Sequence, residues 1–415
     1  MQNNRKPAGS AGKNWYSSTK SDGKKPFYSS SSRGGGRNAG KRVNPGERID
    51  INKFISTAST EIEQKPVVIT HKFTDFGFGP EIELNLKKKN YVTPTPIQDQ
   101  TMSHIMDGRD IIGLANTGTG KTAAFLLPLI NKVVNDRSQK VLIIAPTREL
   151  AIQIENELRQ FSWGMKIFFA TCVGGLPIYS QINNLRRNPN FVIGTPGRLK
   201  DLSNKNVLHF ETFNNIVLDE VDRMLDMGFV DEIRSFLAQL PAKRQSLFFS
   251  ATMPPKIRDL VGTFLIDPIT VKCSTGETAK NVEQDIVKFS HKSEKFSKLQ
   301  ILLNQPELTK VLIFGETKRE VERLTTDLND RGFKAESIHG DKRQGQRQRA
   351  LTQFKNSHVD ILVATDVAAR GLDIKDITHV VNYTVPQSYE DYIHRIGRTG
   401  RGESKGKALT FVEAR

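Results

Sequence analysis

The stretch from Asp110 to Thr122 reads Asp-Ile-Ile-Gly-Leu-Ala-Asn-Thr-Gly-Thr-Gly-Lys-Thr, a short apolar run that passes into a glycine-rich loop. The apolar residues at 123–127 follow and predict the start of a helix. A strand, a glycine-rich loop and a helix in this order predict a phosphate cradle, because amides at a helix N-terminus bind anionic phosphate. Lys121 would reach the β and γ phosphates, and Thr122 would bind Mg²⁺. Ala115 stands at the first glycine of the common phosphate-loop pattern, so a glycine-rich helix start without a ligand is the alternative.

A second apolar run, at 216–218, leads directly into Asp219-Glu-Val-Asp222. Both Asp219 and Glu220 are therefore expected at the end of a strand, Asp219 to hold the metal ion and Glu220 to orient or deprotonate water. An acidic cluster that merely opens the following helix is the alternative. Together with the loop at 115–122, this segment would supply the groups that hydrolysis of a nucleoside triphosphate needs.

Short, largely apolar runs recur along the chain beyond Val67, and segments with helical periodicity lie between them. This alternation favours an α/β fold with parallel sheets and crossover helices, in which ligands bind beyond the carboxyl ends of the strands. We expect two such domains with a cleft between them. The expected strands are 110–114, 141–145, 191–193, 216–218, 247–249, 311–314, 361–364, 380–383 and 408–412, and the expected helices include 149–161, 230–239 and 318–331.

Residues 1–65 are rich in Gly, Ser, Asn and Lys and predict a disordered tail. Its scattered aromatic residues among basic ones could grip single-stranded nucleic acid, and a plain flexible tail is the alternative. Asp50–Ile55 is interpreted as a short docking segment. The formal net charge is +16, and residues 1–50 hold 11 Lys/Arg against 3 Asp/Glu. This excess indicates a polyanion partner, with nucleic acid as first candidate, although basic residues also keep a protein soluble.

The two cysteines, Cys172 and Cys273, are far apart and match no metal-binding or disulfide pattern. They are expected to be ordinary thiols in a reducing compartment. No apolar stretch approaches the ~20 residues that a membrane helix needs, so no membrane association is expected. We expect a cytoplasmic protein, with a nucleus or an organelle left open.

The motifs, taken in their order and spacing, resemble those of the DEAD-box RNA helicases, with Val221 where the family name has alanine. The resemblance extends from Phe73 to Arg415. It implies two tandem RecA-like domains, ATP and Mg²⁺ as cofactors, and RNA as partner. The implied divisions are a disordered tail at 1–65, an adenine-reading region at 71–99, an ATP-binding domain at 102–272, a linker at 273–283 and a C-terminal helicase domain at 284–415.

The segment Asn90-Tyr-Val-Thr-Pro-Thr-Pro-Ile-Gln98 resembles the family's adenine-reading motif, with Asn90 in place of the usual glycine. Gln98 offers a donor and an acceptor that match an adenine edge. Phe73 would stack on the base, and core packing is the alternative for a lone phenylalanine. The resemblance implies nucleotide contacts from Phe73, Gln98, Ala115, Asn116, Thr117, Gly118, Thr119, Gly120, Lys121, Thr122 and Asp373.

The segment His394-Arg-Ile-Gly-Arg-Thr-Gly-Arg401 is poorly suited to a core and well suited to an anion clamp. By resemblance, Arg398 and Arg401 are arginine fingers; a solvated basic loop that binds RNA phosphates is the alternative. Thr384 departs from the family's usual aspartate. The implied catalytic residues are Lys121, Glu220, Arg398 and Arg401, and the implied coupling residues are Asp222, Ser250, Thr252 and His394.

Contacts with RNA are implied for groups that suit phosphates and 2′-hydroxyls, which carry little sequence information. We expect a monomer that closes its cleft around ATP and RNA, so that RNA stimulates hydrolysis and a duplex separates locally. Proteins of ribonucleoprotein or ribosome assembly are expected partners. An ATP-gated RNA clamp without unwinding and a DNA translocase remain the alternatives. The implied RNA contacts are Arg148, Gly175, Thr195, Arg198, Gly340, Gln344, Arg347 and Thr365.

Overall fold

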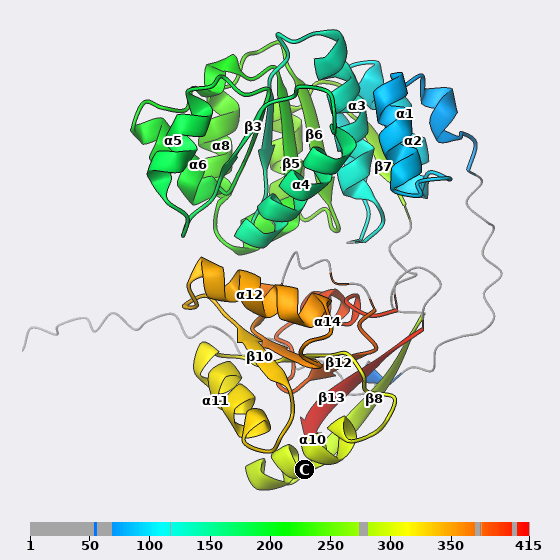
Figure 1. Cartoon of the computed structure of the whole chain (residues 1–415), viewed down its shortest axis with the longest axis vertical. Helices are drawn as coiled ribbons and strands as arrows, with labels where there is room; N and C mark the ends of the chain where they lie inside the picture. The colour runs from blue at the N-terminus through cyan, green and yellow to red at the C-terminus, as the bar shows by residue number, and fades with distance from the viewer. Residues whose placement is uncertain are drawn as a thin grey trace, which may run out of the picture. The chain divides into compact units, whose positions relative to one another are not determined.

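The computed structural model describes residues 54–55, 69–116, 118–273, 281–369, 374, 376–400 and 405–414. These residues form two α/β domains, each built around a parallel sheet, as the sequence predicts (Figure 1). Apart from Phe54 and Ile55, the predicted disordered tail at 1–65 lies outside the described residues, as does the central part of the predicted linker, at 274–280. No helix in the described ranges combines the length and the apolar character that a bilayer crossing demands.

Domain 1 is built on a seven-stranded sheet with the order β3-β4-β2-β5-β6-β1-β7, and all of its pairings are parallel. Its strands are β1 (Ile111–Leu114), β2 (Val141–Ile144), β3 (Phe169–Cys172), β4 (Phe191–Gly194), β5 (Asn215–Asp219), β6 (Gln245–Ser250) and β7 (Ile269–Lys272). Its helices are α1 (Pro80–Lys88), α2 (Pro96–Met106), α3 (Lys121–Asn135), α4 (Arg148–Phe161), α5 (Ile178–Leu185), α6 (Pro196–Asn204), α7 (Val221–Asp226), α8 (Val230–Gln239) and α9 (Pro255–Phe264), with short 3-10 turns at Phe73–Phe76 and Phe210–Thr212.

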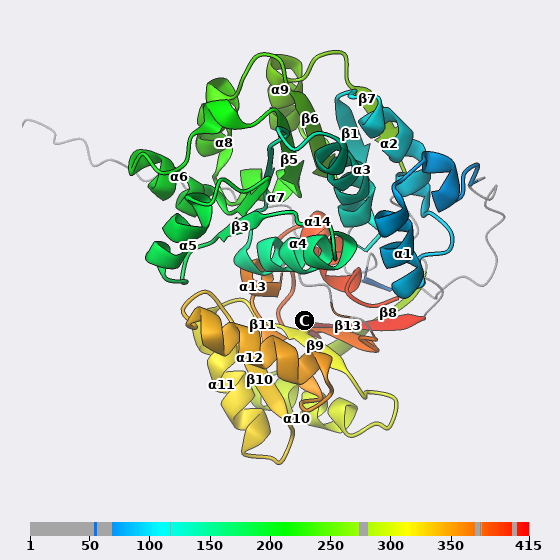
Figure 2. The same ribbon diagram turned by 45° about the horizontal axis from the view of Figure 1, so that its top comes forward.

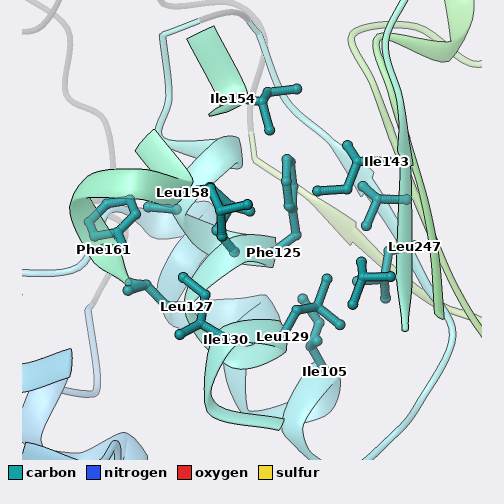
Figure 3. Close-up of a cluster of buried hydrophobic side chains, with 14 of the residues drawn as sticks. Ile105, Phe125, Leu127, Leu129, Ile130, Ile143, Ile154, Leu158, Phe161 and Leu247 are labelled. Atoms are coloured by element: carbon teal, nitrogen blue, oxygen red, sulfur yellow. The ribbon is translucent and has the colours of Figure 1, made fainter. Parts of the chain in front are cut away.

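The central strands of this sheet are buried on both faces, which explains their continuous apolar runs. Successive side chains point to opposite faces, so Ile111 joins one core cluster and Ile112 the other. Helices α1 to α4 pack on the first face, and α5 to α9 on the second. Figure 3 shows part of the first cluster, where Phe125 of α3 lies among Ile143, Leu158 and side chains of neighbouring elements.

Domain 2 is built on a six-stranded parallel sheet with the order β10-β11-β9-β12-β13-β8. Helices α10 and α11 cover one face and α12 and α13 the other. Its first strand begins at Val282, ahead of the boundary at 284, because Val282 and Glu283 pair with Gly406 and Lys407. The strands are β8 (Val282–Phe289), β9 (Val311–Phe314), β10 (Ala335–Ile338), β11 (Ile361–Ala364), β12 (His379–Asn382) and β13 (Gly406–Glu413). The helices are α10 (Lys292–Leu303), α11 (Lys318–Asn329), α12 (Gln344–Lys355), α13 (Asp366–Ala369) and α14 (Tyr389–Ile396), several of which are seen in a second view (Figure 2).

All nine expected strands are present; two have the expected ends, and the ends of the other seven differ by at most two residues. The four strands that the sequence pattern does not indicate, β3, β7, β8 and β10, are the edge strands of the two sheets. Burial along them is partial or alternating, as in β7, where only Val271 is buried. Continuous apolar runs therefore predict the central strands of each sheet but not the edge strands.

Replacement of Phe125 by alanine tests the packing of domain 1. Its ring is fully buried and lies 5.4 Å from the ring of Phe249. We expect Phe125→Ala to lower the free energy of unfolding of domain 1 by about 3–5 kcal/mol, and Phe125→Leu to lower it less, because a smaller cavity remains. Denaturant unfolding followed by the fluorescence of Trp163, in a Trp15→Phe background, reports this domain. Leu84→Ala, at a half-exposed position of α1, should change the midpoint little; an equal effect of both changes would contradict this packing.

Candidate nucleotide-hydrolysing site

The glycine-rich loop connects the end of β1 to the start of α3. Gly118 and Gly120 have φ values of +83° and +91°, which favour glycine. A Cβ atom at Gly120 would also collide with the Gln98 amide. Lys121 is buried and its Nζ donates a hydrogen bond to the Ala115 carbonyl at 2.8 Å. The lysine therefore lies across the loop whose amides would surround phosphate.

Other loop residues either brace the loop or fall outside the description. Thr119 Oγ1 donates to the Asn116 carbonyl at 2.8 Å, and Thr122 is half-buried in the first turn of α3. Thr117, an expected nucleotide contact, lies outside the described residues. The order of strand, loop and helix is thus the predicted one in the described part of this segment.

Gln98 connects the adenine-reading region to the same loop. Its Nε2 donates to the Gly120 carbonyl at 3.0 Å, and its Oε1 accepts from the Thr95 amide at 2.9 Å. The side chain is buried, and each amide atom retains one further hydrogen-bonding position. Phe73 is 5% exposed, and its ring centroid lies 6.0 Å from that of Tyr91, so it occupies the core position given above as the alternative.

The acidic segment begins where β5 ends, as expected. Asp219 is the last residue of β5, and its Oδ1 is buried without a hydrogen-bond partner. Burial, partly offset by the charge of Lys121, raises the pKa of Asp219 from 3.8 to about 7. A buried oxygen without a partner is what a cation or its bound water would satisfy. In the described ranges no three His, Cys, Asp or Glu side chains are grouped so that they could hold a metal ion.

Asp222 has the opposite environment. Its Oδ2 accepts hydrogen bonds from the amides of Ala251 and Thr252 at 3.0 and 2.9 Å, and from Thr252 Oγ1 at 3.2 Å. Its own amide donates to Ser250 Oγ at 3.3 Å. Burial opposes ionisation of Asp222, but Lys121, Arg223 and these donors hold its pKa below the ordinary value. The structure therefore brings Asp222, Ser250 and Thr252 into contact with one another.

Arg223 is a residue of this site that the sequence analysis did not assign. Its Nη1 donates to Glu220 Oε2 at 2.7 Å, and both side chains are buried. Glu220 itself has φ +54°, an uncommon conformation for a residue other than glycine. The ion pair with Arg223 therefore fixes a carboxylate whose backbone is neither in strand nor in helix conformation. The spacing of three residues between Glu220 and Arg223 is the feature of the sequence that could have indicated this ion pair.

Four expected RNA contacts of domain 1 lie beyond the carboxyl ends of neighbouring strands. Arg148 begins α4, and Thr195 caps α6, in whose first turn Arg198 lies. Gly175 has φ +79°, and a Cβ there would approach Arg148 Nη1 to 2.5 Å. Arg198 Nη1 donates to the Leu176 carbonyl at 3.3 Å, beside that glycine in sequence. Backbone and guanidinium groups thus share one edge of the sheet.

In domain 2 the arginine-rich segment spans the end of α14 and the residues after it. His394 lies in the last turn of α14, and Arg398 is 3% exposed. The next residue, Thr399, donates through Oγ1 to the carbonyl of Thr378 at 3.2 Å, which fixes the chain beside Arg398. Arg401 lies outside the described residues.

Arg395 is the second residue that the sequence analysis left without a role. Its Nε and Nη2 donate to the two oxygens of Asp366 at 2.6 and 2.7 Å, and its Nη1 donates to the Thr384 carbonyl at 2.6 Å. The guanidinium centre also lies 5.1 Å from the Phe314 ring centroid. Bidentate pairing of this kind fixes α14 relative to the strand ends of domain 2.

The remaining expected contacts of domain 2 also lie at strand ends or at a helix start. Gly340 follows β10 and Thr365 follows β11, and the Thr365 amide donates to the Ile338 carbonyl at 3.3 Å. Gln344 begins α12, and Arg347 lies in its first turn. Asp373, the expected ribose contact, lies outside the described residues.

Thr384, where the family's usual aspartate is replaced, has a defined partner. Its Oγ1 donates to Glu320, with the two carboxylate oxygens 3.0 and 3.1 Å away, while its carbonyl accepts from Arg395. Threonine therefore keeps a polar contact at this position, as a donor where aspartate would accept.

A phosphate loop and an acidic strand end on one parallel sheet, joined in sequence to a second parallel-sheet domain with an arginine-rich segment, define a nucleoside triphosphatase of the two-domain motor type. The DEAD/DEAH box helicase family matches residues 95–260, and the helicase conserved C-terminal domain matches residues 294–403. The chain belongs to the DEAD-box family of ATP-dependent RNA helicases.

Two bacterial relatives and two solved structures show the extent of this similarity. The ATP-dependent RNA helicase CshA of Listeria monocytogenes is 47% identical over 83% of this chain and 66% of its own length. The DEAD-box ATP-dependent RNA helicase CshA of Bacillus licheniformis is 45% identical over 84% and 72%. The chain thus spans about two thirds of the length of these relatives. Saccharomyces cerevisiae Dbp5 bound to RNA and ADP BeF3 is 29% identical, with a TM-score of 0.74 over 83% of this chain and 90% of that one. Mss116p bound to ssRNA and AMP-PNP is 30% identical, with a TM-score of 0.74 over 82% and 74%.

The contrast between Asp219 and Asp222 gives a testable pair of variants. Because burial raises the pKa of Asp219 from 3.8 in the unfolded chain to about 7 in the folded one, the protein without ligand should lose stability as the pH rises from about 4 to about 7. Asp219→Asn should remove this loss and raise the melting temperature at pH 8 by a few degrees, with a smaller rise at pH 5, where only part of the loss has occurred. Asp222→Asn should lower the melting temperature, because three donors lose a carboxylate.

Thermal unfolding with EDTA, followed across pH 5 to 8, measures both variants. Addition of ATP and Mg²⁺ should raise the melting temperature of the wild type and of Asp222→Asn more than that of Asp219→Asn. A lower melting temperature for Asp219→Asn at pH 8 would show that its carboxylate is satisfied without a ligand.

Proposed function

We propose that the protein separates short RNA duplexes locally, or remodels RNA–protein particles, with energy from RNA-stimulated ATP hydrolysis. The observation that carries this proposal is the buried Asp219 oxygen without a partner, near enough to Lys121 for the lysine charge to lower its pKa. Beside it, Glu220 is held by Arg223. A buried carboxylate oxygen that could bind a cation, a phosphate-binding loop beside it and an oriented carboxylate are parts that hydrolysis of ATP requires.

In this proposal the loop amides and Lys121 hold the phosphates, and Asp219 and Thr122 hold Mg²⁺. The fit rests on the orphaned carboxylate oxygen and on a hydroxyl in the first turn of the helix that follows the loop. When bound, the ion supplies charge neutralisation at the β and γ phosphates. Glu220 orients or deprotonates the attacking water, a role that its buried contact with Arg223 supports by limiting its rotamers.

The variant Asp219-Glu-Val-Asp222 fits this role. Val221 is fully buried in the core cluster beneath α7, with Leu218 and Met224. A valine there replaces one apolar side chain by a larger one and changes no group that touches substrate. Asp222, through Ser250 and Thr252, would transmit the state of the phosphate site to the segment after β6.

Arg398 and Arg401 would complete the site from domain 2. Because the phosphate loop belongs to one domain and the arginines to the other, hydrolysis would require both domains, and RNA that contacts both would favour the active arrangement. The expected RNA contacts of domain 1, Arg148, Thr195 and Arg198, carry backbone-reading groups. The solved complexes of Dbp5 and Mss116p with RNA and nucleotide analogues support this proposal.

The net charge of +16 supports RNA as the main partner. We further propose a cytoplasmic monomer that acts with proteins of ribonucleoprotein or ribosome assembly. Bending of one bound RNA strand on closure would break only the base pairs at the site, so unwinding would be local and not processive.

ATP turnover with and without single-stranded RNA tests the proposed function. We expect RNA to stimulate turnover, and DNA of the same sequence to stimulate it much less. Glu220→Gln should retain ATP binding and lower kcat by about 10²–10⁴-fold, because the water loses its base. Glu232→Gln, which changes an acid on α8 that pairs with Lys200, is the matched control and should leave kcat unchanged. ATP turnover that is the same with and without RNA would refute the proposed function. Wild-type turnover in Glu220→Gln would refute the role of Glu220.

Displacement of a labelled strand from a short RNA duplex separates unwinding from clamping. We expect ATP-dependent displacement by the wild type. In Arg398→Ala the displacement should be lost, and RNA-stimulated hydrolysis should fall by about 10³-fold or more. Arg331→Ala, at an exposed arginine that pairs with Gln300, should behave as the wild type. RNA-stimulated hydrolysis without displacement would favour the ATP-gated clamp.

A further inference from the structure

Phe54 lies ahead of domain 1 in the sequence, yet its side chain is buried in domain 2. It is 1% exposed, and its ring centroid lies 4.7 Å from that of Tyr392 in an edge-on arrangement. Val282 of β8 and Ala408 of β13 belong to the same apolar cluster. The neighbouring Ile55 is 50% exposed, so burial is specific to the phenylalanine.

The pocket around Phe54 is built by elements that are fixed by other contacts. Tyr392 is fully buried, and its hydroxyl donates to Gln284 Oε1 of β8 at 2.9 Å. Tyr392 and Ile396, one helical turn apart on α14, both belong to the cluster. The aromatic ring of Phe54 therefore joins α14 to β8 and β13.

The same cluster reaches the arginine-rich segment by two routes. Along α14, Ile396 precedes Arg398 in sequence by two residues. Through space, Val282 lies against Gly400, where a Cβ atom would approach Val282 Cγ2 to 2.6 Å and the φ is +65°. Gly400 stands between Arg398 and Arg401 in the chain. Loss of packing around Val282 and Ile396 would thus loosen the segment on both sides of Arg398.

We propose that Phe54 is an intramolecular anchor that docks the segment before domain 1 into the pocket of Val282, Tyr392, Ile396 and Ala408, and that it positions the arginine segment after α14. The second half of this inference rests on the function proposed for Arg398. Further along the chain, the amides of Thr70 and His71 donate hydrogen bonds to the carboxylate of Asp99 in domain 1. The anchor would thereby add a non-covalent connection between the domains to the covalent one after β7.

Hydrogen exchange of the full-length protein tests the docking. Burial of a phenylalanine is strong enough to change a local opening equilibrium by about tenfold or more. We expect Phe54→Ala to raise exchange by that factor in Tyr389–Ile396 and in the first half of β8, and Phe54→Leu to raise it less. Ile55→Ala is the matched control and should change neither region. Amides of α3 should be unaffected in every variant, which verifies that the protein is folded.

The measurement is repeated after tenfold dilution of the protein. Protection that does not depend on concentration supports docking within one chain, whereas protection that falls on dilution would show that Phe54 docks into a second copy. Unchanged exchange in Phe54→Ala would overturn the anchor altogether.

Steady-state kinetics tests the positioning half. We expect Phe54→Ala to lower RNA-stimulated kcat several-fold, with the KM for ATP unchanged and partial recovery in Phe54→Leu. Altered exchange with wild-type kcat would overturn the positioning role and leave the anchor. If the wild type shows no RNA-stimulated hydrolysis, the proposed function fails, and the exchange data still decide the docking.

Discussion

The carboxylate of Asp222 holds together the parts of domain 1 that would handle ATP. It accepts hydrogen bonds from the backbone after β6. Asp222 itself lies in the first turn of α7, which follows directly on Asp219 and Glu220 at the end of β5. Parallel strands bring these ends to one edge of the sheet, and the glycine-rich loop after β1 ends at the same edge, since β1 pairs with β6. The start of the loop is also bonded directly to the end of β6, because the Ala115 amide donates to the Ser250 carbonyl at 3.0 Å. Domain 2 has a similar tie, in which Arg395 joins α14 to Asp366 and to the chain after β12.

The sequence was sufficient for the centre of each sheet and for the order of the motifs. Strands buried on both faces consist of continuous apolar residues, so β2, β9 and β11 could be located almost to the residue. The edge strands could not be located, because one side of each lacks a neighbouring strand and residues such as Lys272 and Asp285 interrupt the apolar pattern. The positions of the phosphate loop and of the acidic segment could also be predicted from the apolar runs. Polar residues that end such a run stand where a strand ends.

What the sequence could not provide were contacts that depend on rotamers and on long-range packing. Arg223 and Arg395 each occur within a motif, but only the structure shows that one holds Glu220 and the other holds Asp366. The opposite environments of Asp219 and Asp222, three residues apart, likewise depend on which donors the fold brings to each. The sequence indicates Asp50–Ile55 as a docking segment, but it carries no signal for the pocket that receives Phe54. Its burial depends on a pocket formed more than 200 residues later in the chain.

The polar residues that conceal the edge strands have a consequence of their own. A sheet edge offers unpaired amides and carbonyls to any other extended chain, and charged side chains on that strand oppose such pairing. Glu283, Asp285 and Lys288 on β8, and Lys272 on β7, are charged residues at these outer borders. The side chains that weaken the strand pattern thus protect a concentrated solution of the protein from edge-to-edge aggregation.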